Sequence, residues 1–203
     1  DWPVLRANWP IVALLGALAI GSFNILLYSG LQSTTALNSM LIQSAVPALV
    51  LVVGALVMGD RTSPRQIAGV LISLTGVLAI IARGDPAMLR GLQLNIGDAI
   101  IGGAVLLWAL YSVLLRRPPA VHPLSFLAAS MVVGITVIIP FYAHELWLGR
   151  LIVPVTGSAL AIAYVSIFPS FLAYLFFNRG VELIGSAATG QYMNVMPLMG
   201  AGL

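Results

Sequence analysis

The side chains best suited to chemistry in this chain are uncharged amides placed shortly before prolines, within long apolar stretches. Asn38 and Gln43 precede Pro47, and Gln191 precedes Pro197. Amides donate and accept hydrogen bonds without a net charge, so they suit recognition of a zwitterionic or hydroxylated solute. The alternative is hydrogen bonding between helices, commonly worth only about 0.6 to 2 kcal/mol each in a membrane. Both interpretations stay open at this point.

Aromatic side chains are the second group of candidates. Trp108 and Tyr111 are three residues apart, which places them on one face of a helix. The others are Tyr164 and Tyr174, in a stripe with Phe168 and Phe171, and Tyr192 beside Gln191. A tyrosine in the middle of a membrane span needs a partner for its hydroxyl, which favours an inward position. These rings could form the wall of a binding site, and packing or lipid contact is the alternative.

Pro47 and Pro197 are candidate hinges. A proline within a helix lacks a backbone donor and clashes with the carbonyl four residues earlier, here that of Gln43 or Met193. In a membrane that carbonyl must be satisfied by another helix, a side chain or water. We therefore expect kinks or joints beside a central cavity, with a kink used only for packing as the alternative.

Groups typical of enzymes, metal sites and cofactor sites are missing from the sequence. It contains no cysteine, and its nine basic residues are all arginine. Asp98 lies near the expected start of a helix and Glu182 in an expected turn, so no carboxylate sits at mid-span for ion coupling. A phosphate-binding loop of the G-x-x-x-x-G-K-[ST] type is also absent. We expect neither an enzyme nor a cofactor, a metal or a nucleic-acid partner.

The elements that position these residues are predicted to be membrane helices. The chain has 203 residues, 60% hydrophobic and 7% charged, whereas a soluble domain has about 25% charged residues. Runs of about 20 apolar residues match a ~30 Å hydrocarbon core. The sequence therefore predicts an all-α integral membrane protein, a polytopic helical bundle in contact with the lipid bilayer. About seven spans are expected, near residues 9–31, 36–58, 64–82, 96–115, 123–143, 157–177 and from 186 onward.

The loop arginines predict the orientation of the bundle. If the residues before Trp9 are cytoplasmic, six of the nine arginines lie in inside loops, which favours that orientation. We also expect an inner (plasma) membrane location. The chain begins at Asp1 without an initiator Met and ends at Leu203 within a span. We therefore expect its first helices and its last helix to be absent.

An internal repeat connects the two proline hairpins. A shift of about 150 positions places Gly180 on Gly30 and Pro197 on Pro47. Five spans separate the hairpins, so the two copies have opposite orientations in the membrane. Inverted repeats with broken helices at matching places are typical of transporter folds and indicate the transport pathway.

Three stretches resemble the drug/metabolite transporter superfamily, in its EamA family. The segment G-D-R-T-S-P-R-Q at residues 59–66, with Gly69 and Gly76, resembles the family pattern G-E-x-x-S-x-x-Q-x-x-G, with Asp60 in place of the usual Glu. The second stretch begins with Gly97 and Asp98 and continues through L-W-A-L-Y-S to two arginines. The third is the repeated hairpin with its prolines.

The resemblance implies an inverted-repeat transporter of ten helices in two repeats of five, which exports small metabolites. Residues 1–82 would belong to the first repeat as family helices 3–5, residues 83–95 would link the repeats, and residues 96–203 would be helices 6–9. Our best guess for the substrate is neutral amino acids, aromatic ones included. The alternatives are a carrier of nucleotide-sugars or sugar phosphates and a membrane subunit that does not transport. The oligomeric state stays open.

Overall fold

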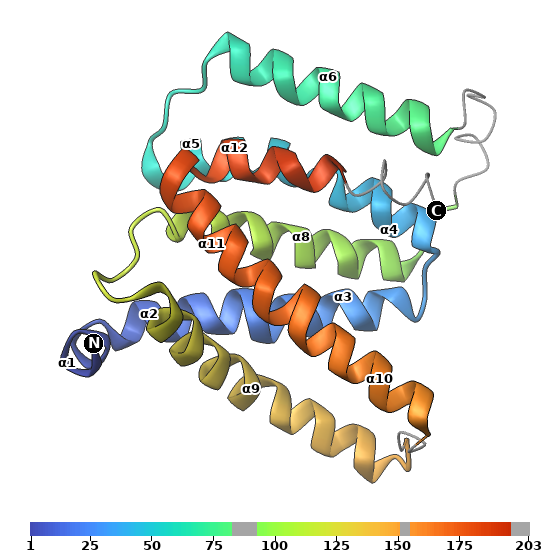
Figure 1. The fold of residues 1–203 in the computed structure, drawn as a ribbon. Coiled ribbons are helices and arrows are strands. Elements are labelled where there is room, and N and C mark those ends of the chain that lie inside the picture. Colours follow the sequence, from blue (N-terminus) through green and yellow to red (C-terminus); the bar gives the residue numbers. More distant parts are fainter. Residues whose placement is uncertain (83–92, 151–154, 196–203) are drawn as a thin grey trace.

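The computed structural model describes residues 1–82, 93–150 and 155–195, and every regular element in these ranges is a helix. Among the described residues, five helical runs are long and apolar enough to cross a membrane, against the seven spans expected from the sequence. They are Trp9–Leu31, Ala36–Met58, Ile96–Leu114, Pro123–Trp147 and Thr156–Ile184. The helix α6 (Pro64–Ile81) is also apolar but shorter. The seventh expected span, from residue 186, continues beyond the described residues. The expected all-α membrane fold is confirmed (Figure 1).

Several of the long runs are made of more than one element. After α1 (Trp2–Ala7), the first run joins α2 (Trp9–Gly16), the π-helical segment η1 (Ala17–Ser22) and α3 (Phe23–Leu31). The second joins α4 (Ala36–Gln43) and α5 (Val46–Met58), and α8 (Ile96–Leu114) and α9 (Pro123–Trp147) follow. The last joins α10 (Thr156–Val165), the π-helical segment η2 (Ser166–Leu172) and α11 (Ala173–Ile184), before α12 (Ser186–Gln191) and the 3₁₀ turn η3 (Tyr192–Val195).

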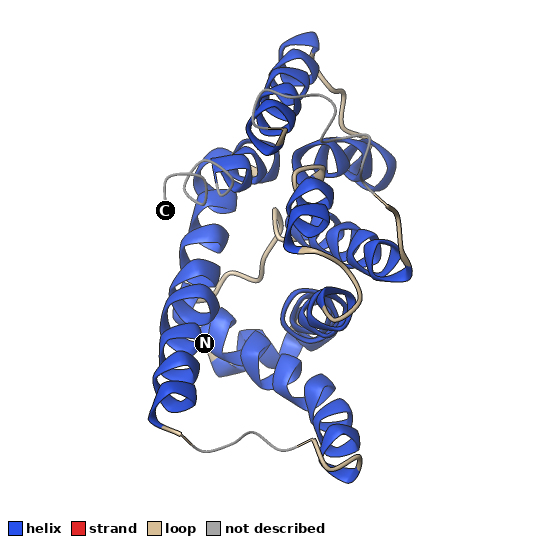
Figure 2. Cartoon of the chain, turned by 90° about the vertical axis from the view of Figure 1, so that its right-hand side faces the viewer, coloured by secondary structure: helices blue, strands red, loops and turns tan. Residues whose placement is uncertain are grey.

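Helix α8 lies in the middle of the bundle, between α3 and α5 (Figure 1). Its packing face is fully buried at Ile101, Ala104 and Ala109. Small residues bring α3 and α8 close together, because a Cβ on Gly97 would come 2.5 Å from the carbonyl oxygen of Gly30. Figure 2, turned by 90°, shows several of the surrounding helices nearly end-on.

Local sequence explains where two of the helices begin. Helix α6 starts at a capping box, in which the Ser63 hydroxyl accepts from the Gln66 N–H and the Gln66 side chain accepts from the Ser63 N–H. Asn95 and Asp98 form the same arrangement at the start of α8. These caps satisfy backbone donors that would otherwise be unpaired at the membrane boundary.

The helix that contains Pro47 is interrupted where the proline predicts. Helix α4 ends at Gln43, and α5 resumes at Val46 with Pro47 in its first turn. The Ser44 hydroxyl donates to the Leu41 carbonyl at 2.6 Å, so a side chain satisfies one of the carbonyls freed at the break. Pro197 lies outside the described residues.

The helix boundaries differ from the expected ones at two places. The run that begins at Thr156 continues to Ile184, so Glu182 lies in a helix and the expected turn there is wrong. Arg179 and Glu182 pair across one helical turn at 2.6 Å, which supports helix beyond the apolar run. The run that begins at Pro123 likewise continues to Trp147.

Candidate functional site

A central cavity of about 640 Å³ lies between α3, α8 and α11, and α4 and α12 complete its wall. Its lining residues are Phe23, Asn24, Leu27, Tyr28, Gln43, Trp108, Val165, Pro169, Ser170, Ala173, Tyr174, Phe176, Phe177, Gly180, Ile184, Thr189, Tyr192 and Met193. They come from distant parts of the chain, so the folded bundle creates the cavity. None of these lining residues carries a charge at neutral pH.

Trp108 is at the centre of the aromatic wall. Its ring centroid lies 4.8 Å from that of Phe23, 4.9 Å from that of Phe177 and 5.5 Å from that of Tyr174. The rings are tilted or edge-on to one another, which is the favourable arrangement for aromatic pairs. The indole Nε1 is buried and has no hydrogen-bond partner among the described residues. Packed among these rings, the indole offers the cavity a rigid aromatic surface.

Tyr174 and Asn24 form a polar network beside the aromatic wall. The Tyr174 hydroxyl donates to the Ala19 carbonyl at 2.7 Å, and the Asn24 amide donates to the Tyr174 oxygen at 3.1 Å. Asn24 also donates to the Ile20 carbonyl at 2.9 Å. The network holds both side chains in place in an otherwise apolar surface.

The two π-helical segments lie beside this network. Ala19, in η1, supplies the carbonyl that Tyr174 binds, and Pro169 and Ser170, in η2, line the cavity. Pro169 lacks a backbone donor, which is a physical reason for the wider turn in η2. π-Helical turns within α-helices occur frequently at functional sites.

Gln43 enters the cavity from the end of α4. Its amide donates to the Ser39 hydroxyl at 3.0 Å, one helical turn earlier. Because the break before Pro47 follows immediately, Gln43 is the last residue of its helix. Thr189 and Tyr192 face the same space from the second hairpin, and the Thr189 hydroxyl donates to the Gly185 carbonyl at 2.9 Å.

The structure brings together four of the eight residues predicted to bind substrate. Gln43, Trp108, Tyr174 and Tyr192 all line the central cavity. Tyr111 lies behind Trp108, with ring centroids 5.5 Å apart, and its hydroxyl donates to the Asn178 side chain. It supports the wall without lining the cavity.

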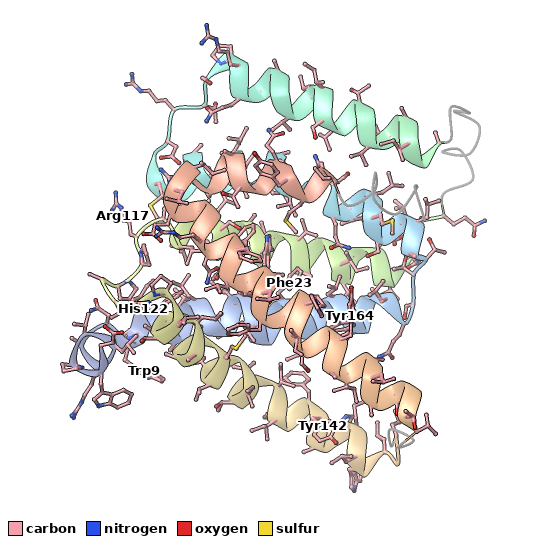
Figure 3. The ribbon with its side chains drawn as sticks, in the orientation of Figure 1. Trp9, Phe23, Arg117, His122, Tyr142 and Tyr164 are labelled. Atoms are coloured by element: carbon pink, nitrogen blue, oxygen red, sulfur yellow. The ribbon has the colours of Figure 1, made fainter. Side chains whose placement is uncertain are left out.

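The other three predicted residues lie elsewhere. Asn38 donates to both carboxylate oxygens of Asp98, at 3.1 and 3.2 Å, and so ties α4 to α8. Gln191 lies toward α6, where a Cβ on Gly69 would come 3.8 Å from its amide nitrogen. Tyr164 is 61% exposed and stacks on Phe168 (Figure 3).

Sequence reasoning missed several of the cavity residues. Asn24 is an amide within an apolar span, and that isolation could have identified it. Pro169 is a mid-span proline of the same kind as Pro47, and its position also carried a usable signal. The sequence carried no signal for Phe23 and Phe177, because a phenylalanine in a membrane helix does not reveal which way it faces.

Charged side chains gather at the end of the bundle where α5 and α8 end. Figure 3 shows Arg117 and His122 at the same end as Trp9. Arg116, next to Arg117, makes an ion pair with Asp60 of the α5–α6 loop, with Arg116 Nη2 3.2 Å from Asp60 Oδ1. Asp98 lies at the opposite end, where it also accepts from the Thr34 hydroxyl. An acidic residue thus ties each end of α8 to a neighbouring segment.

Fold and site together describe a polytopic helical membrane protein with an uncharged cavity that is partly open to its surroundings. A model of the EamA-like transporter family matches residues 2–82 and 95–203. The chain therefore belongs to the EamA-like transporter family, which agrees with the expectation that it is not an enzyme.

Relatives support this membership. The chain is 32% identical over 199 residues to the uncharacterized transporter YyaM of Bacillus subtilis (strain 168), covering 96% of this chain and 64% of the relative. It is 28% identical over 195 residues to an uncharacterized transporter of Archaeoglobus fulgidus, covering 94% and 64%. YetK of Bacillus subtilis (strain 168), also an uncharacterized transporter, is 23% identical over 177 residues, covering 87% and 54%.

The chain thus spans 54 to 64% of the length of these relatives. A solved crystal structure has a similar fold, with a TM-score of 0.72 and 22% identity. The similarity covers 98% of this chain and 70% of that one.

Proposed function

We propose that the protein moves small, largely uncharged or zwitterionic solutes across the membrane by alternating access, with amino acids, aromatic ones included, as the substrate class. The observation that carries the proposal is the central cavity of about 640 Å³, which has no charged residue in its lining. Its size lies within the range of ~300–1,000 Å³ that is usual for small-molecule sites. Membership of a transporter family supports the same function.

The lining of the cavity favours a solute with a flat apolar part and a few polar groups. Trp108, Phe23 and Phe177 offer aromatic surface at one side. Gln43, Asn24 and Thr189 offer hydrogen-bonding groups without net charge. An aromatic amino acid combines both requirements in one small molecule.

A carrier of sugar phosphates or nucleotide-sugars is the second candidate, and the cavity disfavours it. Phosphate recognition in a site withdrawn from water generally uses arginine or lysine. The residues described as lining the cavity include neither. A membrane subunit without transport activity remains the other alternative, and measured flux distinguishes it from a carrier.

The proposed mechanism is a rocking of the two sequence halves about the crossing of α3 and α11, where the central cavity lies. Pro47 would act as a hinge at one side of the cavity. Pro197, at the equivalent position of the second repeat, would act as the other hinge. The arginine-bearing end would face the cytoplasm of an inner-membrane protein, because cytoplasmic loops carry an excess of basic residues. Export is the direction that the family resemblance suggests.

The test is uptake of labelled amino acids into liposomes that contain the full-length protein, with and without a pH gradient. We expect phenylalanine flux in the wild type, and a loss of at least about tenfold in Gln43→Ala and Trp108→Ala if each removes ~1.4 kcal/mol or more of transition-state binding. Tyr164→Ala is the matched control, because this tyrosine is exposed and does not line the cavity.

Absence of flux for every amino acid would refute the proposed substrate class. Equal losses in Tyr164→Ala and Trp108→Ala, with both variants folded, would refute the location of the site. A response of the flux to the pH gradient would reveal proton coupling.

A further inference from the structure

A second hollow lies at the arginine-bearing end of the bundle. It has a volume of about 340 Å³ and lies between the α5–α6 loop, the end of α8 and the turn from α11 to α12. Its charged lining residues are Asp60, Arg61 and Arg116. Ile184 lines both this hollow and the central cavity, so a single side chain borders the two spaces.

The charges of this hollow do not cancel. The Asp60 carboxylate is paired with Arg116 through two contacts, so these two charges offset each other. Arg61 has no ion-pair partner within residues 1–82, 93–150 and 155–195. The hollow therefore keeps one uncompensated positive charge. The lining of the central cavity offers none, so an anionic group finds its charge-matched partner here.

We propose that this hollow, which we call the arginine vestibule (Asp60, Arg61, Arg116 and Ile184), binds the carboxylate of a solute before the solute passes Ile184 into the central cavity. Arg61 would donate charge-assisted hydrogen bonds to the carboxylate, and Thr62 and Gln66 line the same hollow with further donors. The proposal rests on the transport function proposed above. It narrows the substrate class to solutes that carry a carboxylate.

There is a physical reason for placing a charged vestibule next to an uncharged cavity. A carboxylate loses part of its hydration when it leaves water, and a guanidinium offsets that loss better than neutral donors do. Binding in the vestibule concentrates the solute beside the cavity. Because Arg61 is exposed, the attraction is moderate and the solute can leave again.

The experiment compares two solutes that differ only in the carboxylate: phenylalanine, and phenylalaninamide, in which a carboxamide replaces it. Full-length protein in liposomes receives each solute on the arginine-bearing side. Arg61→Gln should raise the KM for phenylalanine about fivefold, equivalent to ~1 kcal/mol, with kcat unchanged. It should leave the KM for phenylalaninamide unchanged. Added salt should weaken phenylalanine uptake by the wild type and have little effect on uptake by Arg61→Gln.

Arg65→Gln is the matched control, because Arg65 is an exposed arginine of the same region that does not line the vestibule. It should behave as the wild type with both solutes. Equal changes in KM for phenylalanine and phenylalaninamide in Arg61→Gln would overturn the vestibule while transport itself stands. If the wild-type protein moves neither solute, the proposed function fails, and the vestibule proposal fails with it.

Discussion

The side chains of Asn24 and Tyr174 are hydrogen-bonded to each other at 3.1 Å, although 150 residues separate them in the chain. That separation equals the offset at which the sequence repeats, with Gly30 placed on Gly180. In an inverted repeat, equivalent residues are related by a two-fold axis and lie on opposite sides of it. Two equivalent residues that contact each other must therefore both lie close to that axis. The bond therefore supports an inverted repeat whose halves cross at α3 and α11.

The π-helical segments follow the same offset. Ala17–Ser22 shifted by 150 positions falls within Ser166–Leu172. Both segments lie next to the contact between Asn24 and Tyr174, and one of them lines the cavity. A pair of wider turns at equivalent places supports a crossing about which the halves could move.

The first prediction concerns the energy of this contact. Tyr174→Phe, Asn24→Leu and the double variant form a double-mutant cycle. We expect a coupling energy of about 0.5–1.5 kcal/mol, because the hydrogen bond between the two side chains exists only when both are present. Unfolding of the purified protein in detergent measures it. Single effects that simply add, within about 0.3–0.5 kcal/mol, would show that the two side chains do not interact.

The second prediction concerns Asp98, which accepts hydrogen bonds from Thr34, Asn38 and the backbone of Asn95. Asp98→Asn keeps the shape but turns an amide donor toward other donors. We expect a clear fall in the midpoint of thermal unfolding, measured in detergent. Asp60→Asn is the control and should lower the midpoint less, because the Asp60 ion pair is 34% exposed at both side chains. Similar falls in the two variants would contradict a structural role for Asp98.

The third prediction concerns the turn between α11 and α12. Gly185 has φ 84° and ψ 160°, a conformation essentially limited to glycine. Gly185→Ala should therefore cost about 1–3 kcal/mol through backbone strain alone. Gly102→Ala is the control, since at both positions an added Cβ meets nothing within 4 Å and only Gly185 has a positive φ. Thermal unfolding that is equally affected in both variants would rule out backbone strain as the cause.

The sequence predicted the class of fold and the approximate place of the helices well, because hydropathy and caps are local signals. Ser63 and Pro64 marked the start of α6, and Pro47 marked the break before α5. The end of α11 was misplaced, because the helix continues past its apolar part through Arg179 and Glu182, which pair with each other on its exposed surface. Hydropathy alone does not register such a pair.

The site was only partly predictable, because a residue type does not reveal which neighbour it meets. Asn38 and Gln43 are both amides shortly before Pro47, yet Asn38 hydrogen-bonds to Asp98 and Gln43 lines the cavity. Tyr164 and Tyr174 belong to one stripe, yet Tyr174 is buried at 7% exposure and Tyr164 is 61% exposed. The wider π-helical turn of η2 lies between the two tyrosines and changes the helical register, so they do not share one environment.

The most direct test of a solute site in the central cavity uses the absence of cysteine from this chain. Ser170 lines the cavity, whereas Ser166, one helical turn earlier, is exposed and does not line it. In full-length protein without other cysteines, Ser170→Cys should react with a water-soluble maleimide, and phenylalanine should slow the reaction. Ser166→Cys should show no protection by phenylalanine. If phenylalanine leaves the labelling of Ser170→Cys unchanged, or protects both cysteines equally, the central cavity is not the place where this solute binds.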